Sequence, residues 1–121
     1  MVVIKLAMNL QLNINRMKFK IIWSDYAESQ LDKIFEYYIE NASHRVAKNL
    51  IQKIIAEPNK LLESPHISQV EDLLLDRENL YRYLICKNYK IIYSVDEKKY
   101  LIQIADVFDT RQNPQKIKRT K

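Results

Sequence analysis

The sequence predicts a single α+β domain, in which an N-terminal strand and an antiparallel two-helix hairpin pack on a twisted antiparallel β-sheet. Three observations lead to this fold class. The chain has 121 residues, of which 47% are hydrophobic, enough for one core of ordinary size. Apolar residues recur at helical spacing in the first half of the chain. In the second half they gather in short runs separated by turn residues.

The segment FKIIWS (19–24) has the composition of a short strand, and a helix is expected to follow it directly. Ser24 is a suitable N-cap, and Asp25 and Glu28 lie in the first turn, where the helix dipole favours negative charge. The helix should end near residues 41–42. Its apolar positions are Ala27, Leu31, Ile34, Tyr38 and Ile39.

A second helix is expected after Ser43, which can cap it, and the short connection requires the two helices to pack antiparallel. A helical period of about 3.6 residues continues across Pro58. Because proline has no backbone N–H, we expect a kink or a restart at that point rather than the end of the helical region. The apolar positions are Ala47, Leu50, Ile51, Ile54, Ile55, Leu61 and Leu62.

The second half of the chain predicts a meander of three antiparallel strands. LYRYLIC (80–86), YKIIYSV (89–95) and YLIQIADVF (100–108) are rich in Tyr, Leu, Ile and Val. The turns between them are KN (87–88) and DEKK (96–99), short enough for consecutive hairpins. The N-terminal strand must join the same sheet, because its apolar residues would otherwise remain in water.

Several classes of protein are disfavoured by composition. Glycine is absent, which disfavours the phosphate-binding loops that need close backbone approach. The single cysteine, Cys86, excludes an internal disulfide and a cysteine-rich zinc site, and we expect a buried, inert thiol. No run approaches the roughly 18 apolar residues of a membrane span, and polar residues interrupt the apolar start of the chain. We therefore expect a cytoplasmic protein without metal, cofactor or small-molecule substrate.

Positive charge is concentrated in the last third of the chain. The whole sequence carries +5, but the part from Leu80 onward holds ten Lys and Arg against four Asp and Glu, a net +6. Residues 1–79 carry −1. Such a field raises the encounter rate with polyanions and acidic proteins, although a basic face kept only for solubility has the same signature.

The order of elements, together with YRYLICKNYKIIY (81–93) and VFDTRQNP (107–114), resembles the RelE/ParE superfamily of toxins from type II toxin–antitoxin systems. The resemblance runs from about Met17 to Ile117, so we expect residues 17–121 to form the toxin domain and residues 1–16 an N-terminal extension. It implies a growth-inhibiting toxin of the plasmid-stabilisation type, neutralised by an antitoxin encoded in the same operon.

Two targets are implied by the resemblance. RelE-like members cleave mRNA on the ribosome with a basic cluster and a late tyrosine, whereas ParE-like members bind and poison DNA gyrase. Arg82, Lys90 and Arg111 are the candidate cations, for catalysis or for binding a partner or an anion. No tyrosine follows Tyr100, and the position expected for it, Ile117, cannot transfer a proton. The ParE branch is therefore favoured, with a RelE-like ribonuclease and a non-toxic basic binding module as alternatives.

Structural roles compete with functional ones at most candidate residues. Arg82 can pair with a helix carboxylate such as Glu36, and Arg111 can simply bind carbonyls of its own turn, since Asp109, Asn113 and Pro114 are good turn residues. Histidine side chains can in principle transfer protons at neutral pH, but His44 and His66 suit ordinary helix-start and loop positions. Tyr81, Tyr83, Tyr89 and Tyr93 are expected to pack in the sheet.

Overall fold

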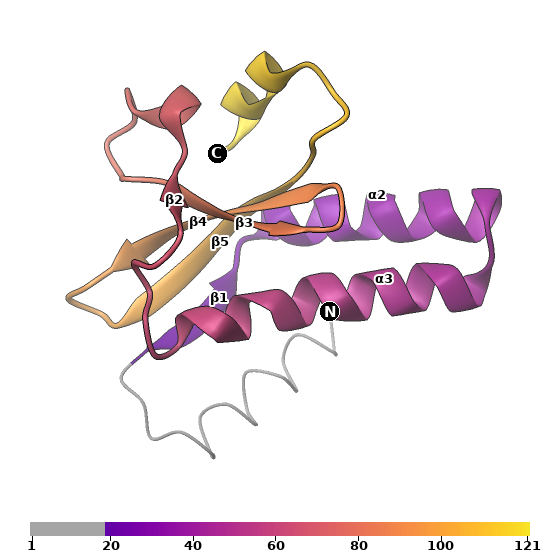
Figure 1. Cartoon of the computed structure of the whole chain (residues 1–121), viewed down its shortest axis with the longest axis horizontal. Helices are drawn as coiled ribbons and strands as arrows, with labels where there is room; N and C mark the ends of the chain where they lie inside the picture. Colours follow the sequence, from indigo (N-terminus) through magenta and orange to yellow (C-terminus); the bar gives the residue numbers. More distant parts are fainter. Residues whose placement is uncertain (1–18) are drawn as a thin grey trace.

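The computed structural model describes residues 19–121 and confirms the α+β fold class (Figure 1). The expected extension at residues 1–16 lies outside the described residues. Two long helices lie side by side on one face of a five-stranded sheet, and the C-terminal segment lies on the other face (Figure 1). The elements are β1 (Lys20–Trp23), α2 (Asp25–Asn41), α3 (His44–Ala56), η1 (Glu57–Leu61), β2 (Gln69–Val70), η2 (Asp72–Leu74), β3 (Arg82–Cys86), β4 (Tyr89–Asp96), β5 (Leu101–Asp109) and η3 (Pro114–Arg119).

The sheet has the order β1-β5-β4-β3-β2 and is mixed rather than wholly antiparallel. The expected meander is present, with β3, β4 and β5 paired antiparallel. β1 does join the sheet, but it pairs parallel to β5, from Lys20 opposite Leu101 to Trp23 opposite Ile104. Local sequence pattern does not indicate this direction, because the helices and the first two strands of the meander separate β1 from β5 along the chain. A short strand, β2, was also not expected; it covers Arg82 and Tyr83 of β3.

Both helices begin where the caps predict. The Ser24 hydroxyl accepts a hydrogen bond from the Ala27 N–H at 3.0 Å, and the Ser43 hydroxyl accepts one from the Val46 N–H at 3.1 Å. Each bond satisfies a donor that the first helical turn leaves unpaired. The expected restart at Pro58 is confirmed, since α3 ends at Ala56 and a 3₁₀ helix continues the chain.

The main core lies between the helices and the sheet. Ala27 and Leu31 of α2 and Ile54 of α3 are fully buried against strand residues such as Ile91 and Ile102. The hairpin of α2 and α3 extends past the sheet (Figure 1), so the far end of α2 has no sheet beneath it. Ile39, expected in the apolar stripe, is accordingly exposed, and Tyr37 beside it is 54% exposed.

Two turns place bulky residues in the left-handed region because the chain has no glycine. Lys87 has φ 56° in the β3–β4 turn, and Tyr100 has φ 55° in the β4–β5 turn. Tyr100 was expected to begin a strand, but β5 begins at Leu101. The Tyr100 ring packs edge-on against Phe19, with 5.6 Å between ring centroids, and its carbonyl accepts from the Lys20 N–H at 2.9 Å. These contacts offset the energetic cost of the left-handed backbone conformation at Tyr100.

A second, smaller core covers the opposite face of the sheet. It joins Ile92, Ala105 and Phe108 of the sheet to Leu74, Tyr81 and Ile117. A β-bulge in β5 makes room for it, since Ile92 pairs with Asp106 and Tyr93 with Ile104, which leaves Ala105 without a partner. No helix in the described part of the chain is both long and apolar enough to cross a membrane.

A buried charge holds the C-terminal segment on this second core. Asp106 is 0% exposed and accepts hydrogen bonds from the Arg119 guanidinium at 3.2 and 3.3 Å and from the Thr120 hydroxyl at 2.9 Å. Arg77 donates to the Thr120 and Lys118 carbonyls from the other side, each at 2.5 Å. The guanidinium of Arg119 also lies 5.2 Å from the centroid of the Phe108 ring.

Arg119→Met should lower the free energy of unfolding by about 3 kcal/mol, because it removes the cation that compensates a buried carboxylate while keeping an apolar stem. Lys118→Met, at the exposed neighbouring side chain, should change it by less than about 0.5 kcal/mol. Urea unfolding of both variants measures the difference. A loss below about 1 kcal/mol in Arg119→Met, as in an exposed ion pair, would contradict a structural role for this network.

Candidate functional site

Arg82 lies on the helix side of the sheet and bonds to the backbone. Its partner on β4 is Tyr93, a member of the main core. The guanidinium donates to the Ser68 carbonyl at 2.8 Å and to the His66 carbonyl at 3.2 Å. The expected alternative, an ion pair with Glu36, is not formed. Arg82 therefore fastens the loop before β2 to the sheet.

Lys90 lies on the opposite face of the sheet from Arg82, and alternation along β4 places it opposite the core residues Ile91 and Tyr93. It pairs with Ile85 and Phe108, on the side of the second core. Its ammonium donates to the Glu71 carboxylate at 2.6 Å and lies 4.2 Å from the centroid of the Tyr83 ring. The Glu71 side chain is only 4% exposed, so Lys90 compensates a nearly buried negative charge.

Arg111 follows the end of β5 and forms a bidentate pair with Asp109. Its Nε donates to Asp109 Oδ1 at 3.0 Å and its Nη2 to Oδ2 at 2.8 Å, while its backbone N–H donates to Oδ1 at 2.9 Å. The Arg111 side chain is nevertheless 60% exposed. The Arg111 guanidinium is thus held in position by its own turn and is still accessible to another molecule.

These three cations do not converge on one point. Lys90 is on the other face from Arg82. Arg82 pairs with Tyr93 and Asp109 pairs with Tyr89, which places the two positions four residues apart along β4, or roughly 13 Å at the usual strand rise. No shared pocket for one phosphate can include all three side chains. Arg82, Lys90 and Arg111 therefore cannot together stabilise a single pentacovalent phosphate.

A hollow beside Arg111 brings several charged and polar side chains together. It has a volume of about 370 Å³ and lies between α2 and the end of β5. It contains three cations, Lys33, Arg111 and Arg119, against the single carboxylate of Asp109. Its complete lining is Gln30, Lys33, Ile34, Tyr37, Tyr89, Val107, Asp109, Arg111, Gln112 and Arg119. An excess of positive charge with amide and hydroxyl groups suits a carboxylate or another anion.

Tyr89 lines this hollow and contacts Tyr38, which lies outside the lining. The Tyr89 hydroxyl donates to the Tyr38 hydroxyl at 3.5 Å. Burial, and then this hydrogen bond, raise the pKa of Tyr89 well above its ordinary value, so it remains a neutral donor at physiological pH. Asp109 raises the pKa of Arg111 further, and Tyr38 adds to the effect. The site therefore carries a permanent cation beside neutral hydroxyl groups.

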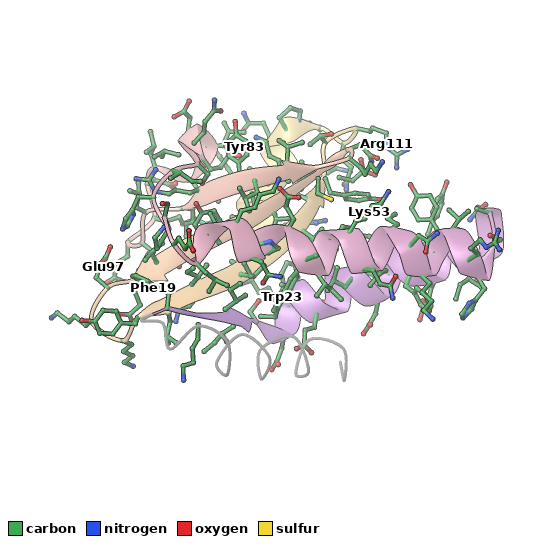
Figure 2. The ribbon with its side chains drawn as sticks, turned by 60° about the horizontal axis from the view of Figure 1, so that its bottom comes forward. Phe19, Trp23, Lys53, Tyr83, Glu97 and Arg111 are labelled. Atoms are coloured by element: carbon green, nitrogen blue, oxygen red, sulfur yellow. The ribbon has the colours of Figure 1, made fainter. Side chains whose placement is uncertain are left out.

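The two histidines lie elsewhere. The His66 ring bonds to the exposed Glu97 of the β4–β5 turn, and Figure 2 places Glu97 and Arg111 at opposite ends of the sheet. His44 packs edge-on against Phe35, with 5.8 Å between ring centroids. Neither histidine lines the hollow beside Arg111. Within residues 19–121, no group of three or more His, Cys, Asp or Glu side chains is placed to hold a metal ion.

The sequence did not identify Lys33 and Arg119 as residues of the hollow beside Arg111. Lys33 lies on the polar side of α2, and nothing in its spacing shows that this side meets the end of β5. Arg119 belongs to a short 3₁₀ helix that no periodicity marks. By contrast, the packing expected for Tyr81, Tyr89 and Tyr93 is confirmed, since all three are buried. Burial also raises the pKa of the Cys86 thiol, which agrees with an inert cysteine.

The Asp109–Arg111 pair gives a pH-dependent prediction. Hydrogen bonds from Arg111 hold the pKa of Asp109 below its ordinary value. The pair therefore contributes its full stability above the ordinary aspartate pKa of about 3.9 and loses it as pH falls through the depressed value. In Arg111→Ala the pKa of Asp109 should rise toward the ordinary value. Carboxyl carbon NMR titration measures it, with Arg45→Ala as the control; an unchanged pKa in Arg111→Ala would contradict the assignment.

Known proteins with related sequences and folds agree with this structure. Residues 21–114 match the family described as the ParE toxin of type II toxin–antitoxin systems, parDE. No curated protein matches the sequence. A solved structure titled "Chromosomal ParDE TA system from P. aeruginosa" is similar in fold, with a TM-score of 0.63 and 17% identity, over 76% of this chain and 96% of that one. Since the family match covers most of the chain, this protein belongs to the ParE toxin family, within the RelE/ParE superfamily.

Proposed function

We propose that this chain is a ParE-like toxin that inhibits its target, a DNA gyrase, by binding to it, and that an antitoxin encoded beside it neutralises it. The family match supports the toxin class. The gyrase target is our inference from the ParE branch of the superfamily. Under this proposal the toxin acts in the cytoplasm, inhibits growth, and can stabilise a plasmid or other element that carries the operon.

The separation of the three candidate cations is the observation that favours inhibition by binding over RNA cleavage. Cleavage through a 2′-hydroxyl needs cations around one phosphate and a proton donor for the leaving oxygen. Here Lys90 is engaged by Glu71 and Arg82 by two carbonyls, on opposite faces of the sheet. At the position expected for the late tyrosine stands Ile117, 1% exposed in the second core. That face is filled by the protein's own C-terminal segment.

Arg111 is the residue we propose as the main contact with the target. It is more than half exposed, oriented by Asp109, and lies in the hollow that holds Lys33 and Arg119. A bidentate guanidinium fixed in advance loses little conformational entropy on binding a carboxylate of a partner protein. Lys33 adds long-range attraction without a fixed geometry.

The proposal predicts inhibition of supercoiling without RNA cleavage. The purified wild-type chain should inhibit DNA supercoiling by gyrase and should leave transcripts intact in a translation extract. Arg111→Ala should raise the concentration for half-inhibition about tenfold, corresponding to about 1.4 kcal/mol. Arg45→Ala, at an exposed arginine on α3 away from the hollow, is the matched control and should act like the wild type. Cleavage of the transcripts together with unaffected supercoiling would instead show that the chain is a ribonuclease.

Antitoxin binding should depend on salt mainly through the association rate. The basic last third of the chain attracts an acidic partner at long range, and the Debye length falls from about 10 Å at 0.1 M to about 3 Å at 1 M ionic strength. The association rate constant should therefore fall at least tenfold over this range, while the dissociation rate changes much less. Stopped-flow measurements with the co-encoded antitoxin give both constants. An association rate indifferent to salt would remove the electrostatic part of the proposal.

A further inference from the structure

The side chains of residues 110–121 carry five positive charges and no negative one. Two of the five, Arg111 and Arg119, are held by aspartates. Figure 1 shows the segment that carries the other three lying on the face of the sheet opposite the helices. These three residues, which we call the C-terminal lysines, are all exposed: Lys116, Lys118 and Lys121.

The C-terminal lysines are attached to a segment that the fold holds in place. Ile117, 1% exposed, and Thr120, 2% exposed, point inward between them. Thr120 is fixed from two sides, because its hydroxyl donates to Asp106 and its carbonyl accepts from Arg77. At the 2.0 Å rise of a 3₁₀ helix, the three lysines are spread over roughly 10 Å. Ammonium groups on a fixed backbone lose less conformational entropy on binding than the same charges on a disordered tail.

The C-terminal lysines form no ion pair within residues 19–121. The Lys121 ammonium lies 5.3 Å from the centroid of the Tyr26 ring. η2, which packs against η3, and the loop after it carry three acidic residues, Asp72, Asp76 and Glu78, but none of them pairs with a C-terminal lysine. The inward residues of the segment therefore serve the fold, and the outward charges are left available for another molecule.

We propose that the C-terminal lysines bind the phosphate backbone of duplex DNA without reading its base sequence. Residues 110–121 contain no aromatic side chain on which an unpaired base could stack. Their one isoleucine, Ile117, is buried, so an acidic protein would find no bulky apolar anchor there. A duplex presents one negative charge per 1.7 Å of its axis, against one per about 3.3 Å for an extended polypeptide that is acidic at every residue. The higher charge density of the duplex favours it for a row of lysines.

The choice of DNA over RNA rests on the proposed function, since an enzyme that supercoils DNA holds a duplex. The C-terminal lysines also lie close to the proposed contact with that enzyme. Arg119, between Lys118 and Lys121 in the chain, lines the Arg111 hollow. The toxin would then contact the enzyme through Arg111 and its DNA through the C-terminal lysines, and each contact would raise the effective concentration for the other.

The test compares two triple variants with the same change in net charge. Lys116→Gln/Lys118→Gln/Lys121→Gln removes the C-terminal lysines, and Lys48→Gln/Lys98→Gln/Lys99→Gln removes three exposed lysines of α3 and the β4–β5 turn. A third variant, Lys116→Arg/Lys118→Arg/Lys121→Arg, keeps the positive charge. Affinity of each isolated chain for a DNA duplex of about 20 base pairs is measured by fluorescence anisotropy between about 50 and 200 mM salt. An RNA duplex of the same sequence and a polyglutamate of about 20 residues are titrated in parallel, and thermal unfolding checks the fold.

At about 50 mM salt the variant without the C-terminal lysines should bind the DNA duplex about 30-fold more weakly than the wild type, or weaker still. The control triple variant should stay within about threefold of the wild type, and the arginine variant within about twofold. The slope of log affinity against log salt should become shallower by about 2.7 in the first variant, because each lost phosphate contact removes about 0.9. If that variant fails to fold, the three single glutamine variants replace it, each with an expected change of about 0.9 in the slope.

Equal losses in the two glutamine triple variants would show an effect of net charge alone and would overturn the inference. Tighter binding of the RNA duplex or of polyglutamate would overturn DNA as the partner. A wild-type chain that inhibits gyrase but does not bind the free duplex would overturn this inference alone. A chain that binds the duplex and leaves supercoiling unaffected would overturn the proposed function alone.

Discussion

The fold depends on the burial of β5 on both faces. This strand pairs with β1 on one side and β4 on the other, and its residues from Ile104 to Phe108 are all buried. The helix hairpin covers one face only, so the other requires a second cover, which the chain supplies from η2 and η3. Asp106 places a carboxylate in the middle of that second face, and only Arg119 and Thr120 of the C-terminal segment satisfy it. Docking of the last residues is therefore part of the fold, since an unpaired carboxylate at that depth would be costly.

This constraint also decides which charges remain available for function. The second face is occupied by the protein's own residues, with Lys90 drawn to Glu71 and Arg119 to Asp106. Arg82 is occupied by backbone carbonyls. Of the three cations that the sequence singles out, Arg111 alone keeps most of its side chain in solvent, and its partner Asp109 orients it without burying it.

Features of the fold that depend on local sequence pattern were predicted correctly, whereas features that depend on a residue distant in the sequence were not. Helix starts at Ser24 and Ser43, the restart at Pro58 and the side on which Lys90 lies all follow from hydrogen bonding or alternation within a few residues. The parallel pairing of β1 cannot be predicted in this way, because strand direction depends on the path of the whole chain. The burial of Asp106 cannot be predicted either, since no local pattern links it to residues 13 and 14 positions later. The same holds for the candidate site: Arg111 is recognisable in the sequence at the end of a strand, whereas Lys33 and Arg119 reach the hollow only through packing.

Binding and neutralisation place different physical demands on one small surface. Under the proposed function, target inhibition needs a fixed, accessible contact, which the bidentate Asp109–Arg111 pair would provide at the rim of the hollow. Neutralisation needs a contact that forms quickly and lasts, which favours long-range attraction together with apolar anchors.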